Sequence, residues 1–398
     1  MKYNPFLIQA QHRERVSELS KRGITSPLAE QLARYGENML IHMESLTWEE
    51  AHFLRHAMQL CGGEAVIISG HPGDEIQAEV LLLANRSQLE LALQKISSEE
   101  IGMVAAAAEI REAVALREQL DRRKKLVCGQ HVLPLGERTL IMGILNVTPD
   151  SFSDGGRYVD LDQAIRQARL MVEAGADVID IGGESTRPGS EPVDAAEELD
   201  RVLPIIRALS AEVQVPLSID TYKAEVADRA VQAGAHIIND IWGAKRDPQM
   251  AAVAARHQVP IILMHNREDR NYRHFYADFV KDLRESVQIA LNAGVRHDQI
   301  ILDPGIGFAK SLDQNLETMR RLDDLVGLGY PVLLATSRKS MIGHVLDLPV
   351  EDRMEGTAAT VALGVAKGCH MVRVHDVKEM KRVTTMMDAM LKGGVHIG

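Results

Sequence analysis

From about residue 130 onward, short apolar runs alternate along the chain with longer amphipathic stretches. Eight runs, rich in Val, Ile and Leu, each lead into a polar residue. They occupy residues 139–146, 177–186, 215–220, 235–240, 259–265, 300–305, 330–339 and 370–376. The stretches between them, such as 161–176 and 228–235, close on a glycine, as helix C-termini often do. The pattern therefore predicts eight strands separated by helices.

Nearly continuous aliphatic strands alternating with helices are typical of a parallel sheet covered by helices. Eight such units within about 260 residues favour a closed (β/α)8 barrel over an open doubly wound sheet. A nucleotide-binding sheet would normally carry G-x-G-x-x-G after its first strand, and that pattern is absent here. We therefore predict an α/β fold in which residues 126–398 form a TIM barrel with its site at the strand C-termini.

Residues 1–125 follow another pattern, which predicts a small α+β N-terminal domain in the order β-α-β-β-α. The expected strands are residues 37–44, 63–69 and 78–84, and the expected helices are 47–62 and 87–96. Helical signals also occur at 12–21 and at 26–36, where Ser26 and Pro27 suit the N-cap and N1 positions. The charged run 117–126 is interpreted as a helix end or a linker, with a solvated face as the simplest meaning. The segment lacks a cluster of side chains suited to chemistry.

Composition narrows the class of protein. The 398 residues are 45% hydrophobic and 25% charged, which is ordinary for a globular protein. A net charge of -11 and only 4% aromatic residues argue against a nucleic-acid surface. The three cysteines are scattered without a CxxC pair, which disfavours disulfides and structural zinc. The N-terminus lacks the apolar core of a signal peptide and no run is long enough to cross a membrane, so we expect a cytoplasmic protein.

Polar residues at the strand ends form the candidate site. Residues i and i+2 of a strand point to the same side, so Arg373 and His375 share a face, as do Ser337 and Lys339 if the chain is still extended there. The barrel mouth is expected to gather Asn146, Asp220, Asn239, Asp303, Lys339, Arg373 and His375. Buried carboxylates without partners are costly, so such a group favours a polar ligand.

Each of these residues also has a plain structural explanation. Asp303 would suit a cap on the turn that follows it. Lys339 alone would pass for a surface lysine, and His375 for a packing residue. Asn239 would bond only to backbone, and His265 is not assigned as a ligand. Their repetition at strand C-termini is what favours a site.

Several strings in the barrel resemble, in order, the motifs of the dihydropteroate synthase family. They are NVTPDSFSDGG, GGESTRPGS, SIDTY, IIND, LMHNR, LDPGIGFAK, TSRKS and RVHD, within residues 146–376. The first two are long and highly specific, whereas LDPG or RVHD alone would be weak. The resemblance covers the barrel from about Leu126, and the additional N-terminal domain is the departure from it.

The resemblance implies a transferase of folate biosynthesis that joins 6-hydroxymethyl-7,8-dihydropterin diphosphate to 4-aminobenzoate and releases pyrophosphate. The pterin would be bound by Asp220, Asn239, Asp303 and Lys339, between Ile241 and Met264. Arg373 and His375 would meet the diphosphate, and Asn146 would hold Mg²⁺, an ion that binds few protein ligands. In the loops 147–158 and 184–193, Asp154 would face a developing pterin cation. Phe152, Thr186, Arg187 and Pro188 would form the aminobenzoate pocket with Ser337 and Lys339, where sulfonamides compete.

The family also implies a homodimer. Two rival classes remain: a methyltetrahydrofolate:corrinoid methyltransferase on a similar barrel, and a pterin-binding regulatory protein without turnover. Neither needs the diphosphate-facing residues Asn146, Arg187, Arg373 and His375. Three roles stay open for the N-terminal domain: a dimerisation element, a lid over the barrel bottom, or a docking site for another folate enzyme.

Overall fold

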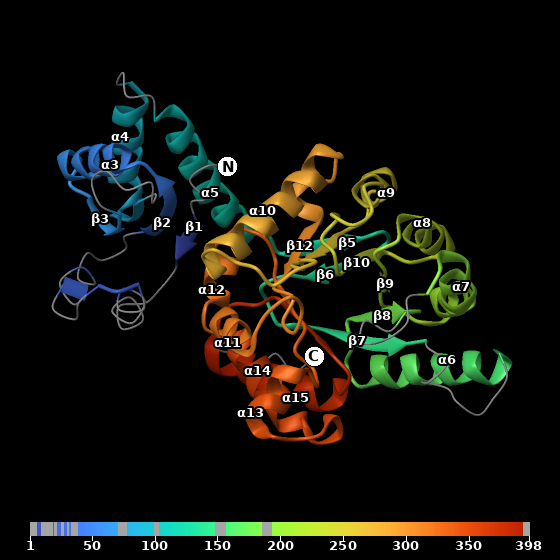
Figure 1. The fold of residues 1–398 in the computed structure, drawn as a ribbon. Coiled ribbons are helices and arrows are strands. Elements are labelled where there is room, and N and C mark those ends of the chain that lie inside the picture. Colours follow the sequence, from blue (N-terminus) through green and yellow to red (C-terminus); the bar gives the residue numbers. More distant parts are fainter. Residues whose placement is uncertain are drawn as a thin grey trace. The chain divides into compact units, whose positions relative to one another are not determined.

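The computed structural model describes residues 6–8, 19, 22–24, 28–29, 32, 39–70, 78–98, 103–147, 157–184 and 193–392. The chain divides into two compact units (Figure 1). The first comprises Met1–Arg122 with Gly327–Gly329, and the second comprises Arg123–Val326 with Tyr330–Gly398. Each unit has its own hydrophobic cluster, and each is described separately below.

The first unit is an antiparallel four-stranded sheet with helices, which confirms the predicted α+β class and adds one strand to the three expected. Its strands β1 (Phe6–Ile8), β2 (Met39–Leu46), β3 (Glu64–Ser69) and β4 (Ala78–Ala84) lie in the order β1-β2-β4-β3. The helices are α3 (Trp48–Leu60), α4 (Arg86–Ser98) and α5 (Val104–Arg122). Thr47 caps α3 in a capping box with Glu50, which satisfies orphan amides at the helix start.

The charged run 117–126 proves to be the end of α5 followed by the first residues of a strand. One strand, β1, was not predicted. The two helical signals at 12–21 and 26–36 lie mostly outside the described residues. Buried aliphatic side chains of the sheet and helices, among them Met43, Leu54 and Ile110, form one cluster, so the unit has a core of its own.

The second unit is the predicted parallel barrel. Its strands lie in the order β12-β11-β10-β9-β8-β7-β14-β13. They are β7 (Leu140–Asn146), β8 (Val178–Gly182), β9 (Leu217–Asp220), β10 (Ile237–Asp240), β11 (Ile261–Met264), β12 (Ile300–Asp303), β13 (Leu333–Leu334) and β14 (Met371–Val374). A parallel bridge between Leu302 and Val332 joins β12 to the start of β13, and the Leu302 amide donates to the Pro331 carbonyl at 2.9 Å. The ring is thereby nearly closed.

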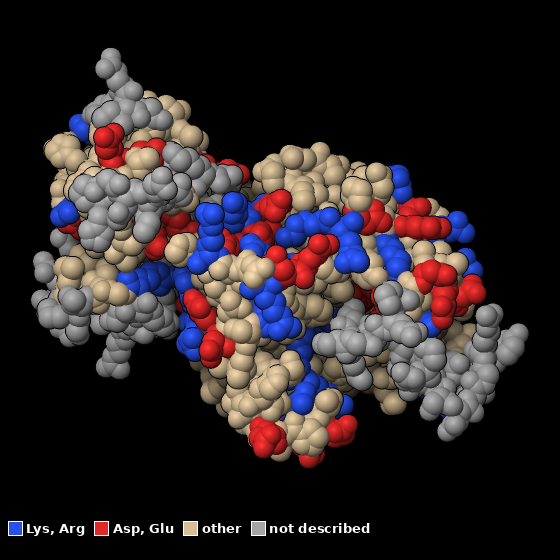
Figure 2. All heavy atoms as spheres, in the orientation of Figure 1, with Lys and Arg blue, Asp and Glu red and all other residues tan. Residues whose placement is uncertain are grey.

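Helices follow the strands around the outside of the ring (Figure 1). They are α6 (Arg157–Glu173), α7 (Ala195–Glu212), α8 (Ala224–Ala233), α9 (Met250–His257), α10 (Phe275–Asn292), α11 (Leu312–Arg320), α12 (Leu322–Val326), α13 (Ser340–Leu346), α14 (Met354–Ala366) and α15 (Val377–Lys392). Short 3-10 turns occur at His297–Gln299 and Val350–Asp352. In the described part of the chain, no helix is both long and apolar enough to span a bilayer. Lys and Arg are mixed with Asp and Glu over the face drawn in Figure 2.

An unpredicted hairpin packs against the barrel at the N-terminal ends of its strands. Its strands are β5 (Lys125–Cys128) and β6 (His131–Pro134), which pair antiparallel. Leu126 and Leu133 from the hairpin join one apolar cluster with Leu140 of β7, Ile237 of β10 and Met371 of β14. The cluster fills the lower part of the ring, so the site must be built at the opposite ends of the strands.

We expect this hairpin to contribute to barrel stability through its inward side chains. Leu126 is fully buried, whereas the neighbouring Val127 is 51% exposed. Leu126→Ala should lower the free energy of unfolding by about 2–4 kcal/mol, because it leaves a cavity in the cluster. Val127→Ala, the matched control on the same strand, should cost less than about 1 kcal/mol. Urea unfolding followed by circular dichroism measures both, and equal effects would contradict this account.

Candidate active site

The barrel interior changes from apolar to polar along the strands. Alternate residues of a strand face the same side, and pairs two residues apart share the interior. Such pairs are Ile237 and Asn239, Ile301 and Asp303, and Met371 and Arg373, the first of each belonging to the lower apolar cluster. The second residues are polar and lie at the C-terminal ends, where barrel sites are built. The predicted gathering of strand-end residues follows from this alternation.

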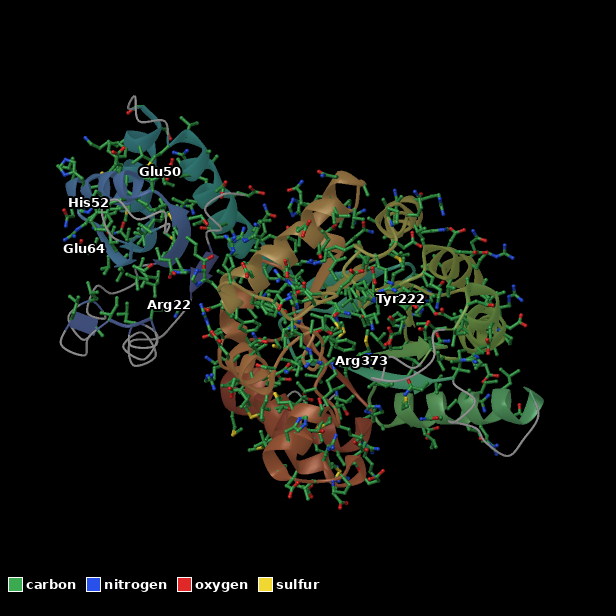
Figure 3. All side chains as sticks on the ribbon, in the orientation of Figure 1. Arg22, Glu50, His52, Glu64, Tyr222 and Arg373 are labelled. Atoms are coloured by element: carbon green, nitrogen blue, oxygen red, sulfur yellow. The ribbon has the colours of Figure 1, made fainter. Side chains whose placement is uncertain are left out.

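Arg373 lies on β14 in the barrel (Figure 3) and bonds to two other members of this polar layer. Its side chain is 16% exposed, and its Nε donates to Asp180 Oδ2 at 2.6 Å. Its Nη2 donates to Asp220 Oδ2, also at 2.6 Å. Burial lowers the pKa of Arg373, but the carboxylates of Asp180 and Asp220 outweigh burial, so the net shift of this pKa is upward. The guanidinium is thus clamped between two strands, β8 and β9.

Asp180 is not among the residues predicted from the sequence, because it lies inside the apolar run VIDIG. Its side chain has no solvent exposure. Besides Arg373, Asn239 Nδ2 donates to its Oδ2 at 3.1 Å. The other oxygen, Oδ1, is buried with no hydrogen-bond partner among the described residues. A buried carboxylate oxygen without a donor is costly, so the layer has an acceptor to offer a ligand.

Register places three predicted residues, Asn146, Asp220 and Asn239, at one level with Gly182. Asn146 on β7 pairs with Gly182 on β8, Gly182 pairs with Asp220 on β9, and Asp220 pairs with Asn239 on β10. A Cβ added to Gly182 would stand 3.7 Å from Asp220 Oδ2 and 3.8 Å from Asn146 Oδ1. The side-chain oxygens of Asp220 and Asn146 therefore both lie beside Gly182.

Three ionisable groups in the layer, Asp220, Lys339 and Asp303, have shifted pKa values. Burial raises the pKa of Asp220 to about 7, against the opposing effect of Arg373. Burial lowers the pKa of Lys339 to about 8, and the Asp303 carboxylate opposes that shift. The pKa of Asp303 is raised by burial and held back by Lys339. Groups titrating near neutrality in a buried cluster are common at functional sites.

Asp303 is both a turn cap and a member of the layer. Its Oδ1 accepts the Gly305 amide at 2.7 Å, which is the plain structural explanation considered for it. It is also 2% exposed and electrostatically coupled to Lys339. Gly305 has φ +62°, and a Cβ there would stand 2.0 Å from the His265 carbonyl oxygen. Glycine is therefore required at this turn.

Ser337 and Lys339 do not lie on an extended strand. β13 ends at Leu334, and the Lys339 amide donates to the Thr336 carbonyl at 3.1 Å, which closes a turn. Lys339 Nζ lies 4.8 Å from the centre of the Phe308 ring. Ser337 Oγ lies 2.9 Å from His375 Nδ1 and accepts the His375 amide at 3.2 Å. A turn, not strand alternation, thus presents both side chains.

The remaining predicted residues fall into two groups. Ile241 and Met264 are buried, 9% and 3% exposed, just beyond β10 and at the end of β11. Asn146 is half-buried at the end of β7. Five lie outside the described residues, namely Phe152, Asp154, Thr186, Arg187 and Pro188.

The side-chain oxygens at the barrel mouth determine whether a magnesium ion could bind there. Among the described residues, no group of three or more His, Cys, Asp or Glu side chains could hold a metal ion. The Asn146 amide oxygen at the end of β7 suits an ion that takes one protein ligand and completes its shell with phosphate oxygens and water. The residues present fit such an ion.

A parallel barrel with buried carboxylates, an amide and two cations at its mouth defines a pterin-binding type of enzyme. The sequence model of the family described as "Pterin binding enzyme" matches residues 142–375. A dihydropteroate synthase of Bacillus subtilis (strain 168) is 61% identical over 280 residues, 70% of this chain and 98% of that protein. The chain therefore belongs to the pterin-binding enzymes, and among them to the dihydropteroate synthases.

Solved structures agree with this assignment. A dihydropteroate synthase of Clostridium difficile, solved in the presence of pteroic acid, shares 49% identity and a TM-score of 0.64 over 65% of this chain and 99% of that one. The enzyme of Xanthomonas albilineans with 4-aminobenzoic acid shares 40% identity and a TM-score of 0.64 over 67% and 98%. Membership in the dihydropteroate synthases, which are enzymes, sets aside both the corrinoid methyltransferase and the regulatory protein without turnover. The N-terminal region is additional to the family.

The Asp220 carboxyl gives a testable dependence of stability on pH. Its pKa is about 7 in the folded protein and near 4 in an unfolded chain. Between those values the folded state keeps a proton that the unfolded chain has lost, so Asp220 lowers the free energy of unfolding as the pH rises. Asp220→Asn cannot titrate, so its melting temperature should fall less than that of the parent between roughly pH 5 and pH 8. Thermal unfolding at the two pH values measures the difference.

The exposed Asp313 provides the control for this measurement. Asp313→Asn removes one carboxyl without touching the polar layer and should keep the parent's dependence. An Asp220→Asn variant that loses as much thermal stability as the parent over the same pH interval would contradict the account.

Proposed function

We propose that the polar layer binds the pterin of 6-hydroxymethyl-7,8-dihydropterin diphosphate for condensation with 4-aminobenzoate. The observation that supports this best is the buried Asp180–Arg373–Asp220 cluster, which has an unmatched carboxylate oxygen and a carboxyl group titrating near pH 7. A pterin presents N–H donors on its amino-pyrimidinone edge, and carboxylates and amides can pair with them in a directed way.

The pterin is oriented by residues of neighbouring strands. Asp220, Asn239 and Asp303 meet its donor edge, and Lys339 donates to its carbonyl and ring nitrogen. Ile241 and Met264 form an apolar wall against the ring. Buried polar groups gain most from a ligand that satisfies them, and this set has polar groups on one level and apolar side chains beside it.

Arg373 changes partners when substrate binds. In the structure its guanidinium is held by Asp180 and Asp220. A pterin N–H that pairs with Asp220 replaces the Nη2 contact, and the released end of the guanidinium turns to the diphosphate. Asp180 keeps the Nε contact and so limits how far Arg373 moves. His375, positioned by Ser337, completes the cationic side.

The reaction is a dissociative displacement. The bond between the pterin methylene carbon and the diphosphate oxygen breaks first, and the electron pair leaves with the diphosphate. The amine nitrogen of 4-aminobenzoate then bonds to that carbon and loses a proton. Arg373, His375 and Arg187 stabilise the charge that develops on the leaving group, and Asp154 faces the pterin cation. Asn146 would hold a Mg²⁺ ion when one binds, and that ion would supply further positive charge at the diphosphate.

The second substrate occupies the outer part of the mouth. Phe152, Thr186, Arg187 and Pro188, with Ser337 and Lys339, form the aminobenzoate pocket, and the loops 147–158 and 184–193 close over it to exclude water. Sulfonamides, which resemble 4-aminobenzoate in shape, compete there.

A second copy of the chain is the proposed partner. Large apolar side chains stay exposed on the last helices of the barrel: Val345, Leu346, Val350, Met354, Leu363, Met386, Met390 and Leu391. α14 packs against α15 and α13, so much of this surface belongs to one helical group, and exposed apolar patches of this kind mark interaction sites. All three cysteines are free thiols, which agrees with a reducing, cytoplasmic location.

Two substitutions separate the proposed roles. Asp220→Ala should raise KM for the pterin diphosphate by about tenfold or more, because it removes a buried hydrogen-bond acceptor. Arg373→Ala should mainly lower kcat, by about 10²-fold, because it removes charge stabilisation at the leaving group. Steady-state assays of pyrophosphate release with both substrates and magnesium measure this. Equal, mild effects of both substitutions would contradict the roles, and no turnover by the parent at micromolar enzyme would contradict the function.

The N-terminal domain, proposed as residues 1–125, is not expected to take part in the chemistry. Every assigned residue lies in the barrel, and the Bacillus subtilis relative is covered over 98% of its length by 70% of this chain. A chain that begins at Arg123 should therefore keep kcat and both KM values within about threefold. Its oligomeric state, measured by light scattering beside the full chain, tests whether this domain adds to dimerisation. A loss of more than about tenfold in kcat would assign the domain to the active enzyme.

A further inference from the structure

A buried lysine next to the site has no part in the reaction described above. Lys310 ends the motif LDPGIGFAK and is 4% exposed. Its Nζ donates to the Gly305 carbonyl at 3.1 Å and to the Phe308 carbonyl at 3.3 Å, and lies 2.8 Å from His265 Nδ1. Burial lowers the pKa of Lys310 well below its usual value, and the Asp303 carboxylate opposes that shift. In its protonated form the amine has three donors, and this environment offers three acceptors. A surface lysine would not be built in this way.

The two carbonyls bound by Lys310 bracket the turn that supports the pterin-facing charges. At one end, the Gly305 amide donates to Asp303 Oδ1 at 2.7 Å. At the other, the Phe308 ring lies 4.8 Å from Lys339 Nζ. A Cβ on Gly307, between them, would meet Lys339 Cδ at 3.4 Å. The position of both Asp303 and Lys339 therefore depends on the shape of residues 305–308.

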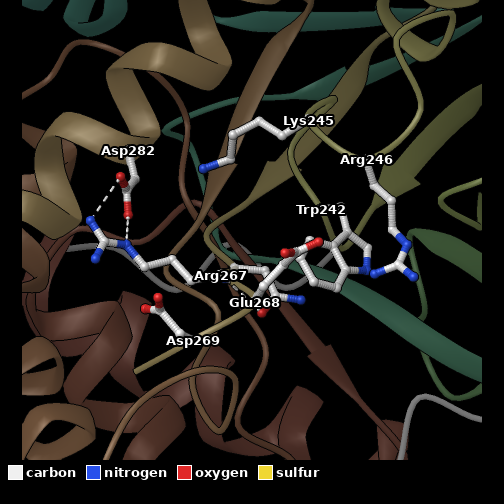
Figure 4. A pocket seen from close by; sticks show the side chains of 8 residues that line it. Trp242, Lys245, Arg246, Arg267, Glu268, Asp269 and Asp282 are labelled. Carbon is white, nitrogen blue, oxygen red and sulfur yellow. Dashed lines mark hydrogen bonds and ion pairs between the residues drawn. The ribbon is translucent and has the colours of Figure 1, made fainter. Parts of the chain in front are cut away.

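His265 connects this lysine to the outer wall of the barrel. Its ring is fully buried, and its Nε2 lies 3.0 Å from Asp282 Oδ2 on α10. Arg267 Nε and Nη2 donate to the same carboxylate at 2.5 and 3.1 Å. Figure 4 shows this Arg267–Asp282 pair on the wall of a cavity of about 620 Å³, lined also by Trp242, Lys245 and Glu268. The chain of contacts runs inward from the cavity wall to the turn at Gly305.

The pKa values of His265 and Asp282 are shifted by burial and by their neighbours in this chain of contacts. Burial and the neighbouring Lys310 lower the pKa of His265 to about 3, so the ring is neutral. Burial opposes ionisation of Asp282, but hydrogen bonds with His265 and Arg267 outweigh it and lower the pKa of Asp282 to about 2. A neutral imidazole donates from one nitrogen and accepts at the other. His265 therefore donates from Nε2 to Asp282 and accepts at Nδ1 from Lys310.

We propose that Asp282, His265 and Lys310 form a positioning relay that holds the Gly305–Phe308 turn, and with it Asp303 and Lys339, in the geometry that binds the pterin. The inference rests on the proposed role of Asp303 as a pterin ligand. None of the three relay residues touches the substrate. They act through the turn, as outer partners orient the residues of a site.

The test measures pterin affinity separately from folding. Lys310→Met keeps the side-chain length and removes all three donors. It should weaken binding of 6-hydroxymethylpterin, followed by pterin fluorescence, and raise KM for the pterin diphosphate by about ten- to hundredfold, the range for loss of an orienting charged hydrogen bond. KM for 4-aminobenzoate should stay within about threefold. Circular dichroism and the melting temperature report folding independently.

Two further substitutions test the histidine. His265→Phe fills the same space without either hydrogen bond and should reproduce the loss seen for Lys310→Met. His265→Gln keeps one donor and one acceptor in a single amide and should restore pterin affinity to within about fivefold of the parent. Rescue by glutamine and not by phenylalanine supports a positioning role, because both replace the ring. Equal pterin affinity in the two variants would overturn it.

Two controls make the outcome decisive. Lys367, which donates to Asp323 Oδ2 at 3.0 Å and is 18% exposed, is a partly buried lysine outside the site, and Lys367→Met should leave pterin affinity unchanged. Asp303→Asn tests the underlying role and should weaken pterin binding. If Asp303→Asn weakens binding and Lys310→Met does not, the relay is overturned and the proposed function stands. If neither substitution matters, both the relay and the assigned role of Asp303 are wrong.

Discussion

Placing a guanidinium inside the barrel is the constraint on which the polar layer depends. A buried cation must be paired and hydrogen-bonded, because desolvation otherwise exceeds any gain. Arg373 meets this requirement with Asp180 and Asp220, each at 2.6 Å. Removing one partner of a buried pair is far more costly than the pair is worth. The residues that hold the interior together are therefore also those assigned to the ligand.

The charge balance of the layer explains its readiness for a ligand. Three carboxylates, Asp180, Asp220 and Asp303, face two cations, Arg373 and Lys339. Burial raises the pKa of Asp220 to about 7, Arg373 opposes that rise, and the neighbouring Asp180 carboxylate adds to it. The Oδ1 of Asp180 has no hydrogen-bond partner among the described residues. A ligand rich in N–H donors relieves both conditions at once, whereas an anion alone would meet only the cations.

The sequence predicts the barrel and most of its mouth for a physical reason. Buried parallel strands must be nearly all apolar, so Asp220, Asn239 and Asp303 stand out where each strand ends. Asp180 was missed because one carboxylate within VIDIG does not interrupt that pattern; a charge inside an otherwise aliphatic strand is the signal that would have revealed it. Lys310 was missed because a lysine after a turn resembles a surface residue.

Other errors came from tertiary context. The assumption of an extended chain at Ser337 failed, because β13 has only two residues before the turn at Thr336 to Lys339. The hairpin of β5 and β6 was absent from the prediction, since four-residue strands with an exposed face carry a weak pattern. In the N-terminal domain the predicted order β-α-β-β-α matches β2, α3, β3, β4 and α4, whereas β1 and most of α5 were not predicted.

The hairpin of β5 and β6 affects the route by which ligands reach the site. Because an apolar cluster fills the N-terminal end of the barrel, ligands reach the polar layer from the C-terminal ends of the strands. If the substrates bind as proposed, the pterin would occupy the deeper position and would bind before the arylamine. The joined product would then leave by the same route. A closed N-terminal end of the barrel thus favours an order of binding and release for the two proposed substrates.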